Sequence, residues 1–407
     1  MANLISRQII ESLRTGVPIR EAVQLVGSGQ PSLEAEFNDL LKQVRTGKPR
    51  NDSGFIFFGD FGTGKSHALE FFASGAENSG FVVSRATISR NLQLSNHRAI
   101  LSQLVAQMST KDHREDALAR ILDDSTSMGS DFSGFQTWCA GEVTAGNLAS
   151  IYGSIAQALP NLRYGTEEFD KLMSYLAGSA TQQEIKRAVS APRSEVPPTE
   201  DRTWQTIHFI SNLFVHLGFN GWILLLDELE LIRMIGSASA RVARGKSYAS
   251  LSKWFDFSRE SKSRAFATVG CMTSGFVAEI IEYGPYSWND EGNIPNALLA
   301  SASPHLASPA AEAMKFITSQ DAKKSLQLAW PSSEDKERLQ ESLKGIYESA
   351  FDTKSPRLPI HGESFESIRI YIRRWIAQWD LSRHGRKDSV TINAVTQNFE
   401  SDDEDDE

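Results

Sequence analysis

The 407-residue chain is long enough for two or three structural units and for a full α/β core. Its apolar fraction of 40% and charged fraction of 23% are typical of a soluble protein. No run approaches the roughly 18 apolar residues of a membrane span, and the start MANLISRQII lacks the basic and apolar regions of a signal peptide. These features argue against a membrane protein and predict a cytoplasmic one.

The net charge of −9 comes mostly from the segment ESDDEDDE at residues 400–407, which holds seven carboxylates. The other 44 of the 51 acidic groups nearly balance the 42 basic groups, so the body of the chain is close to neutral. We interpret the tail as a solvated, disordered end, with a docking arm or nucleic-acid mimic as the alternative. Only two cysteines occur, Cys139 and Cys271, without a C-x-x-C pair, which indicates a reducing compartment and no structural zinc.

The N-terminal region predicts short helices ahead of the first strand. Apolar residues recur at helical spacing over residues 6–26, with a break at 16–18, and again over residues 33–44. Two interpretations stay open for these helices: they cover the adenine of a nucleotide, or they cover one edge of the core.

Residues 53–70, SGFIFFGDFGTGKSHALE, predict a strand, a phosphate loop and a helix. The segment fits G-x-x-x-x-G-K-[ST] at every fixed position. We expect Gly59, Gly62 and Gly64 to let the backbone amides turn around a polyphosphate, with the positive end of the helix at the same place. The predicted nucleotide-binding residues are Gly59, Asp60, Phe61, Gly62, Thr63, Gly64, Lys65, Ser66 and His67.

Two residues of this loop have individual chemical roles in the prediction. Lys65 places a cation between the β- and γ-phosphates of ATP, and the Ser66 hydroxyl holds Mg²⁺. The expected cofactors are therefore ATP and Mg²⁺. A glycine-rich turn without a ligand is the alternative, which the apolar strand before the loop and the helix after it disfavour.

A strand at residues 81–87 and a helix at 97–108 follow, so that strand and helix alternate as in a parallel sheet. Residues 111–201 then read as a helical insertion of unknown role, with helical patterns at 148–159, 167–176 and 182–189. The proline-containing stretch 190–199 predicts a linker.

A helix at residues 203–217 leads to GWILLLDELE, residues 221–230, whose apolar run is typical of a strand buried on both faces. Asp227 is the candidate for the Mg²⁺ side of the site, and Glu228 is the candidate general base for an attacking water. For Glu230 we favour an exposed position in the first turn of a helix over a place in the water network.

Residues 236–246 predict a flexible loop with three cations, Arg241, Arg244 and Lys246, before a helix at 247–257. These cations either reach a phosphate group of a neighbouring nucleotide or nucleic acid, or are simply solvated. A further buried strand is expected at residues 265–272. Thr273 at its exit either senses the γ-phosphate through water or caps the next helix.

The C-terminal part predicts a loop-rich region at residues 283–309 and helices beyond it. One helix begins at a serine cap and spans residues 332–351; another spans 364–381 with a buried apolar stripe. Three interpretations stay open for the basic residues of the last helix and its end: a nucleotide lid, a DNA contact or a solvated face. They are Arg369, Arg373, Arg374, Arg383, Arg386 and Lys387.

Five segments together resemble the ATP-binding proteins of BREX-type anti-phage systems, BrxD in particular. They are RQIIESLRTGVPIREAV with GSGQP, GDFGTGKSH, VVSRATIS, LLLDELELI and ARGKSYASL. The resemblance implies an ATPase related to AAA+ proteins that works on DNA in a defence complex, beside a helicase-like partner. It also carries the family's ATP-site roles onto Gly59, Gly64, Lys65, Ser66, Asp227 and Glu228.

We therefore predict an α/β P-loop NTPase of AAA+/ASCE-like type: a parallel sheet flanked by helices, a helical insertion and a C-terminal helical lid. The expected segments are residues 1–50, 51–310, 311–392 and the tail 393–407. One hypothesis is a hydrolysing motor or loader; the other is a nucleotide-gated scaffold with slow hydrolysis. The modest charge of the body argues against tight autonomous DNA binding, and a homo-oligomer stays open.

Overall fold

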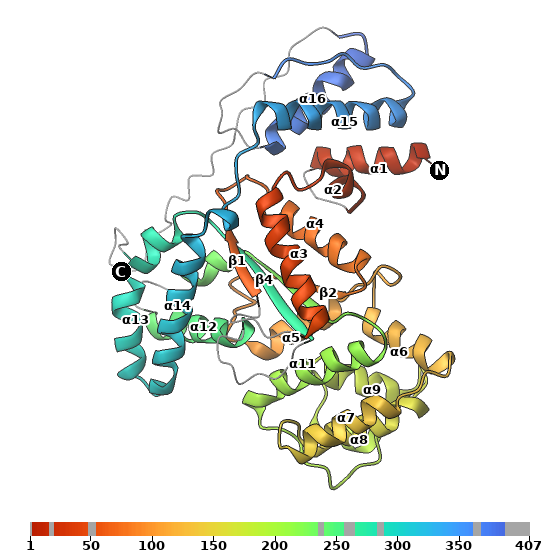
Figure 1. Ribbon diagram of the computed structural model, residues 1–407, viewed down its shortest axis with the longest axis vertical. Helices are drawn as coiled ribbons and strands as arrows, with labels where there is room; N and C mark the ends of the chain where they lie inside the picture. The colour runs from red at the N-terminus through yellow and green to blue at the C-terminus, as the bar shows by residue number, and fades with distance from the viewer. Residues whose placement is uncertain are drawn as a thin grey trace, which may run out of the picture. The chain divides into compact units, whose positions relative to one another are not determined.

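The computed structural model describes residues 2–15, 20–47, 54–234, 240–255, 265–282, 289–360 and 368–386. Their contacts divide the chain into two compact units (Figure 1). The larger unit takes residues of Gln30–Asp60 and Ala68–Leu328, and the smaller unit takes the described residues of Met1–Gly29, Phe61–His67 and Ala329–Glu407. This division differs from the four predicted segments, and the tail 393–407 lies outside the described residues.

Within the described ranges, the larger unit is built on a four-stranded parallel sheet with the order β1-β4-β3-β2. Because all four strands run the same way, their carboxyl ends meet at one edge, where ligands bind in open α/β sheets. The predicted α/β class with a parallel sheet is therefore confirmed. The strands are β1 (Gly54–Phe58), β2 (Val82–Thr87), β3 (Trp222–Asp227) and β4 (Phe266–Met272).

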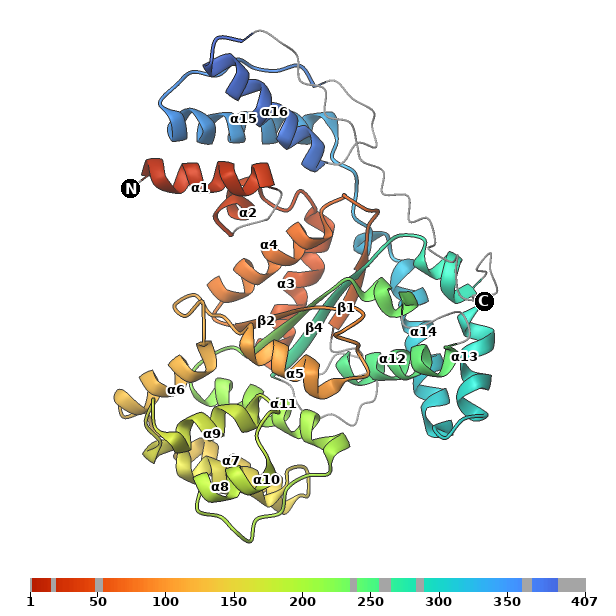
Figure 2. The ribbon, with the colours of Figure 1, turned by 180° about the vertical axis from the view of Figure 1, so that it is seen from behind.

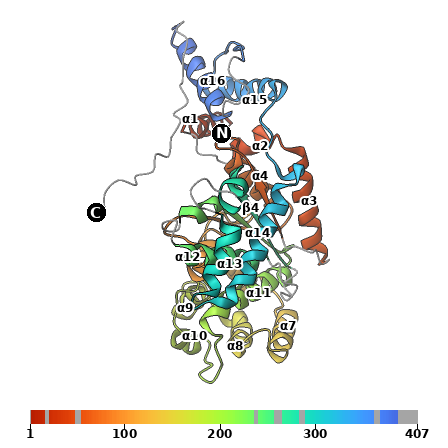
Figure 3. The ribbon, with the colours of Figure 1, turned by 90° about the vertical axis from the view of Figure 1, so that its left-hand side faces the viewer.

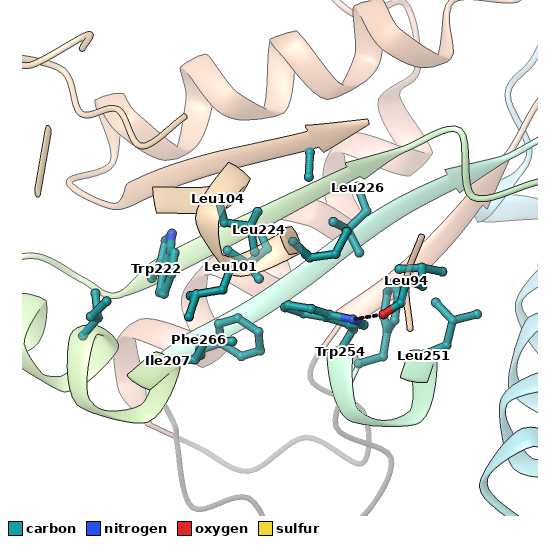
Figure 4. Close-up of a cluster of buried hydrophobic side chains, with 14 of the residues drawn as sticks. Leu94, Leu101, Leu104, Ile207, Trp222, Leu224, Leu226, Leu251, Trp254 and Phe266 are labelled. Atoms are coloured by element: carbon teal, nitrogen blue, oxygen red, sulfur yellow. Dashed lines mark hydrogen bonds between the residues drawn. The ribbon is translucent and has the colours of Figure 1, made fainter. Parts of the chain in front are cut away.

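Apolar side chains alternate between the two faces of this sheet. One face, which includes Phe57, Leu225 and Val269, packs against α3 (Pro31–Thr46) and α4 (Lys65–Asn78) (Figure 1). The other face packs against α5 (His97–Ala106), α11 (Thr199–His216) and α12 (Arg241–Trp254) (Figure 2). Figure 4 shows this second cluster, in which Trp254 Nε1 donates to the Leu94 carbonyl at 3.4 Å.

The segment between β2 and β3 is helical, and its apolar side chains join the second cluster. Three of its helices coincide with predicted patterns, whereas α6 and α7 were not predicted because polar and small residues interrupt their apolar spacing. Of the predicted linker, residues 190–199, residues 190–198 contain no helix, whereas Thr199 already begins α11. The Glu195 carbonyl accepts from the Ile151 amide at 3.0 Å. The helices are α6 (Ala117–Ser127), α7 (Ser133–Thr144), α8 (Ser150–Ala158), α9 (Glu167–Leu176) and α10 (Gln182–Ala188).

The predicted loop-rich region at residues 283–309 is wrong for its described part, 289–309. α13 (Asp290–Leu299) and α14 (Ala307–Asp321) occupy most of it. The Asn289 side chain caps α13 by accepting from the Gly292 amide at 3.0 Å, and acids follow in the first turn. Pro295, within this helix, obscured the signal in the sequence.

The predicted flexible basic loop is also wrong where it is described, because α12 already begins at Arg241; residues 236–239 lie outside the described residues. Arg244 is 1% exposed and donates from Nη2 to Asp290 Oδ1 at 2.8 Å and from Nε to Oδ2 at 3.3 Å. The Tyr248 hydroxyl donates to the same carboxylate at 3.0 Å. Arg244 therefore joins α12 to α13 and is not a cation available to phosphate.

Short helical turns complete the larger unit. In the described part of this unit, four of the turns are 3-10 helices and the turn after β4 is a π-helix. The 3-10 helices are η1 (Leu159–Asn161), η2 (Leu229–Met234), η4 (Pro304–Leu306) and η5 (Lys324–Leu326), and the π-helix is η3 (Val277–Glu282).

The smaller unit contains α1 (Ala2–Thr15), α2 (Arg20–Val26), α15 (Ser333–Phe351) and α16 (Ile368–Arg383) (Figure 3). Ile10 of α1 packs with Tyr347 of α15 and with the Trp375 and Trp379 rings of α16. The predicted cap at Ser332 is confirmed, and so is the buried stripe of the last helix within α16. Residues 364–367 of that predicted helix lie outside the described residues. Arg373 donates to the Thr15 carbonyl at 2.7 Å, so this arginine joins α16 to the end of α1.

None of the helices in the described ranges has both the length and the apolar character that a membrane crossing requires.

The Arg244–Asp290 pair predicts a large difference between two cations of α12. Arg244→Ala leaves the Asp290 carboxylate buried without its ion partner, so the free energy of unfolding should fall by roughly 3–5 kcal/mol. Lys246→Ala, at an exposed position two residues away, should change it by less than about 0.5 kcal/mol. Urea unfolding of both variants measures the difference. Equal losses would show that Arg244 is a solvated cation after all.

His97 predicts a pH dependence of stability. Its Nε2 lies 2.8 Å from Ser250 Oγ, its ring packs on Trp204 and Trp254, and burial, with the charge of Lys253, lowers the pKa of His97 to about 4. The unfolded chain binds this proton near pH 6.5, so the stabilisation is complete above that pH and is lost as the pH falls toward 4.

Between pH 7 and pH 5 the wild type should therefore lose roughly 1–2 kcal/mol more unfolding free energy than His97→Gln does. Urea unfolding at the two pH values gives the comparison. Parallel losses in the two proteins would contradict the lowered pKa.

Candidate functional site

The phosphate-loop motif begins at the carboxyl edge of the sheet. Gly59 directly follows β1 and still pairs with the β4 side: its amide donates to the Met272 carbonyl at 3.2 Å, and its carbonyl accepts from the Ser274 amide at 3.4 Å. Gly62 and Gly64 have φ values of 85° and 106°, a left-handed region that favours glycine. The backbone thus turns where the motif predicts a turn.

α4 begins at Lys65, so the positive end of its dipole lies at the motif. Lys65 is 8% exposed and Thr63 is buried as well, whereas the Phe61 ring is 73% exposed. His67 Nε2 lies 2.7 Å from the Gly27 carbonyl, which can only accept, so this nitrogen carries the proton. His67 therefore connects the start of α4 to the turn after α2.

Asp227 ends β3 at the same edge of the sheet and is 8% exposed. Leu226 is in register with Gly270 of β4, so the next residues along the two strands, Asp227 and Cys271, lie side by side. Cys271 Sγ donates to Asp227 Oδ1 at 2.9 Å, and the Glu228 amide donates to the same oxygen at 3.0 Å. The described residues make no hydrogen bond to the second carboxylate oxygen, Oδ2.

Asp227 also lies on the face of the sheet that α4 covers. Side chains along a strand alternate between faces, and Ile223 and Leu225 of β3 pack with Leu69 and Phe72 of α4. Asp227, two residues after Leu225, points to this face as well. The carboxylate and the helix that starts in the motif thus belong to one side of the sheet.

Glu228 has an unusual backbone, with a φ of 62°. This left-handed conformation costs a glutamate on the order of 1–3 kcal/mol and persists only where its surroundings fix it. Here the Glu228 amide is held by Asp227, and its carbonyl accepts from the Leu231 amide at 3.0 Å. Strained residues of this kind concentrate at functional sites.

The predicted exposed position of Glu230 is wrong. Glu230 is 4% exposed and lies in η2, which follows Glu228. The 3-10 turn sits against the sheet because Gly270 has no side chain: a Cβ there would lie 2.4 Å from Leu229 Cδ1. Leu229 is buried by this approach, and Glu230 and Ile232 of the same turn are buried as well.

Cys271 is a contact that the sequence reasoning missed. Burial and the negative charge of Asp227 raise the pKa of Cys271 well above its usual value, so the thiol keeps the proton that it donates. Neither cysteine belongs to a C-x-x-C pair, so no local motif marks this contact in the sequence. The signal that could have indicated the contact is the position of Cys271 near the end of a predicted strand, comparable to the position of Asp227 at the end of another.

Thr273 follows β4 and is partly buried, and its carbonyl accepts from the Phe276 amide at 3.3 Å. Its sensor role stays a prediction. Among the C-terminal basic residues, the Arg383 guanidinium lies 4.1 Å from the centre of the Phe351 ring, and Arg386 is exposed. Lys387 lies outside the described residues.

Residues 2–127 match the family model of the BREX system ATP-binding protein BrxC/D. The matched residues include the phosphate-loop motif and end ahead of β3. No match was found among curated proteins or among solved structures. The family match confirms, for residues 2–127, the resemblance to BREX ATP-binding proteins that the sequence indicates.

Proposed function

We propose that this protein binds ATP with Mg²⁺ and hydrolyses it. One observation carries the proposal: Asp227 points to the α4 face at the sheet edge where the phosphate loop begins, with one oxygen fixed by two donors and the other without a hydrogen bond from the described residues. The phosphate-loop motif and the family match over residues 2–127 support ATP as the ligand.

In this proposal the loop from Gly59 to Ser66 surrounds the phosphates with its amides, and the start of α4 adds its dipole. Lys65 neutralises charge on the β- and γ-phosphates. The loop is completed by Asp60, Phe61, Thr63 and His67. Thr273 is the candidate sensor of the γ-phosphate, and capping of the next helix is the alternative role for this residue.

The residues present fit a magnesium ion. Mg²⁺ prefers oxygen ligands and is commonly bound by one or two carboxylates together with substrate phosphates. Ser66 would supply its hydroxyl, and Asp227 would supply Oδ2, directly or through water. The ion would neutralise charge on the phosphates during transfer.

Glu228 is proposed as the general base. Its side chain accepts a proton from water while the water oxygen bonds to the γ-phosphorus and the bond to the β–γ bridging oxygen breaks. The held left-handed backbone supports this role, because it fixes the direction of the side chain directly after the metal-side carboxylate. A scaffold that only binds nucleotide has no need of such a constraint.

We further propose that ATP turnover serves a BREX-like anti-phage complex, in which it remodels or loads a DNA-associated assembly beside a helicase-like partner. The family match over residues 2–127 supports a role in a BREX-type defence system. The same proposal has three further parts. The protein is related to AAA+ ATPases, α15 and α16 act as a lid, and the protein forms a homo-oligomer. The near-neutral body of the chain favours DNA contact through partners over tight binding by this protein alone.

Two substitutions separate binding from hydrolysis. Lys65→Ala should abolish ATP binding because the phosphate charge loses its cation. Glu228→Gln should retain binding and lower kcat about 100-fold or more, because the amide cannot accept the proton. Calorimetric titration with ATP and steady-state phosphate release, with and without DNA, are the measurements.

Matched controls are Lys246→Ala and Glu291→Gln, both at exposed positions, and both should behave as wild type. Normal turnover by Glu228→Gln would refute the base assignment. If wild type binds ATP but shows no turnover with or without DNA, the scaffold hypothesis replaces hydrolysis.

A further inference from the structure

Asp227 is held by a thiol that comes from the neighbouring strand. Cys271 is fully buried on β4, the strand between β1 and β3, and its Sγ lies 2.9 Å from Asp227 Oδ1. A carboxylate oxygen can only accept, so the thiol is the donor. The contact follows from the register of β3 and β4, which places the two residues side by side.

The two oxygens of Asp227 have different surroundings. Oδ1 accepts from both the Cys271 thiol and the Glu228 amide, and the described residues leave Oδ2 without a hydrogen bond. One donor follows Asp227 directly and the other comes from the adjacent strand β4, so together they restrict rotation of the carboxylate about its Cβ–Cγ bond. They therefore select which oxygen faces outward from the sheet edge.

The same oxygen also links the thiol to the proposed base. The Glu228 amide donates to Oδ1, and Glu228 has a left-handed backbone. A change in the position of the Asp227 carboxylate would therefore alter the hydrogen bond that holds the Glu228 backbone. Loss of the thiol leaves that amide as the only donor to Oδ1 in the described part of the chain.

We propose that Cys271 is a positioning residue for the metal site: its thiol orients Asp227 so that Oδ2 faces Mg²⁺. This inference rests on the proposed function. Groups that hydrogen-bond to metal ligands fix their orientation, and their loss commonly weakens metal binding 10–100-fold. Cys271 would act only through Asp227, without touching ATP.

The test compares Cys271→Ala, which removes the donor, with Cys271→Ser, which keeps one. For each protein, titration calorimetry measures ADP binding without metal and then across a series of Mg²⁺ concentrations. Cys271→Ala should need roughly ten-fold more Mg²⁺ for half-maximal enhancement of ADP binding. Cys271→Ser should stay close to wild type, and metal-free ADP binding should be unchanged in both.

Cys139→Ala is the matched control, because Cys139 is also fully buried but lies on α7, where its thiol makes no hydrogen bond to the described residues. It should leave the Mg²⁺ requirement unchanged. If Cys271→Ala has the wild-type requirement, the inference about Cys271 is overturned while the proposed function stands. If wild-type ADP binding does not respond to Mg²⁺ at all, the proposed function and the inference both fail.

An infrared measurement tests the contact without relying on the Cys271 variants. The S–H stretch of Cys271 should lie at lower frequency than that of Cys139, because donation to a carboxylate weakens the S–H bond. Cys139→Ala assigns the two bands, and Asp227→Asn should raise the Cys271 frequency. Two bands at the same frequency, unchanged by Asp227→Asn, would overturn the inference.

Discussion

The hydrogen bonds that Asp227 Oδ1 accepts are the interaction on which the proposed site depends. A nearly buried carboxylate is stable only when donors compensate for the water that it has lost. Here one donor comes from the next residue and the other from the adjacent strand, so the compensation exists only in the correct sheet register. Pairing β3 with β4 therefore determines both the fold of the sheet edge and the direction of its acid.

The rest of the larger unit stabilises this edge. The apolar residues of α3, α4 and the sheet bury one face, and the helical insertion, α11 and α12 bury the other. The free energy gained by burying this core offsets two costs at the site: that of the left-handed backbone of Glu228 and that of burying the Glu230 side chain. Gly270 provides the close approach that holds η2 against the sheet, directly after the proposed base. The backbone strain of Glu228 is thus maintained by packing elsewhere in the larger unit.

Local patterns allowed much of the fold to be predicted. Some features depend on neighbours in the sequence and could be predicted from it: the turn at Gly62 and Gly64 with the helix after it, the buried strands, the Ser332 cap and the stripe of α16. The buried Arg244 pairs with Asp290, 46 residues away, and the close packing of Leu229, next to Glu230, depends on Gly270 of β4. The contact between Cys271 and Asp227 spans 44 residues. Such pairings follow from the strand and helix arrangement, which no local pattern specifies.

A crystal structure with Mg²⁺ and a non-hydrolysable ATP analogue tests the central claim most directly. The account predicts phosphate oxygens at the amides of residues 62–66 and a magnesium ion about 2.1 Å from Ser66 Oγ, with Asp227 Oδ2 bound to it directly or through one water. Asp227 Oδ1 should remain on Cys271 and the Glu228 amide. A nucleotide bound elsewhere, or a magnesium ion that Asp227 does not reach even through a water, would contradict the account.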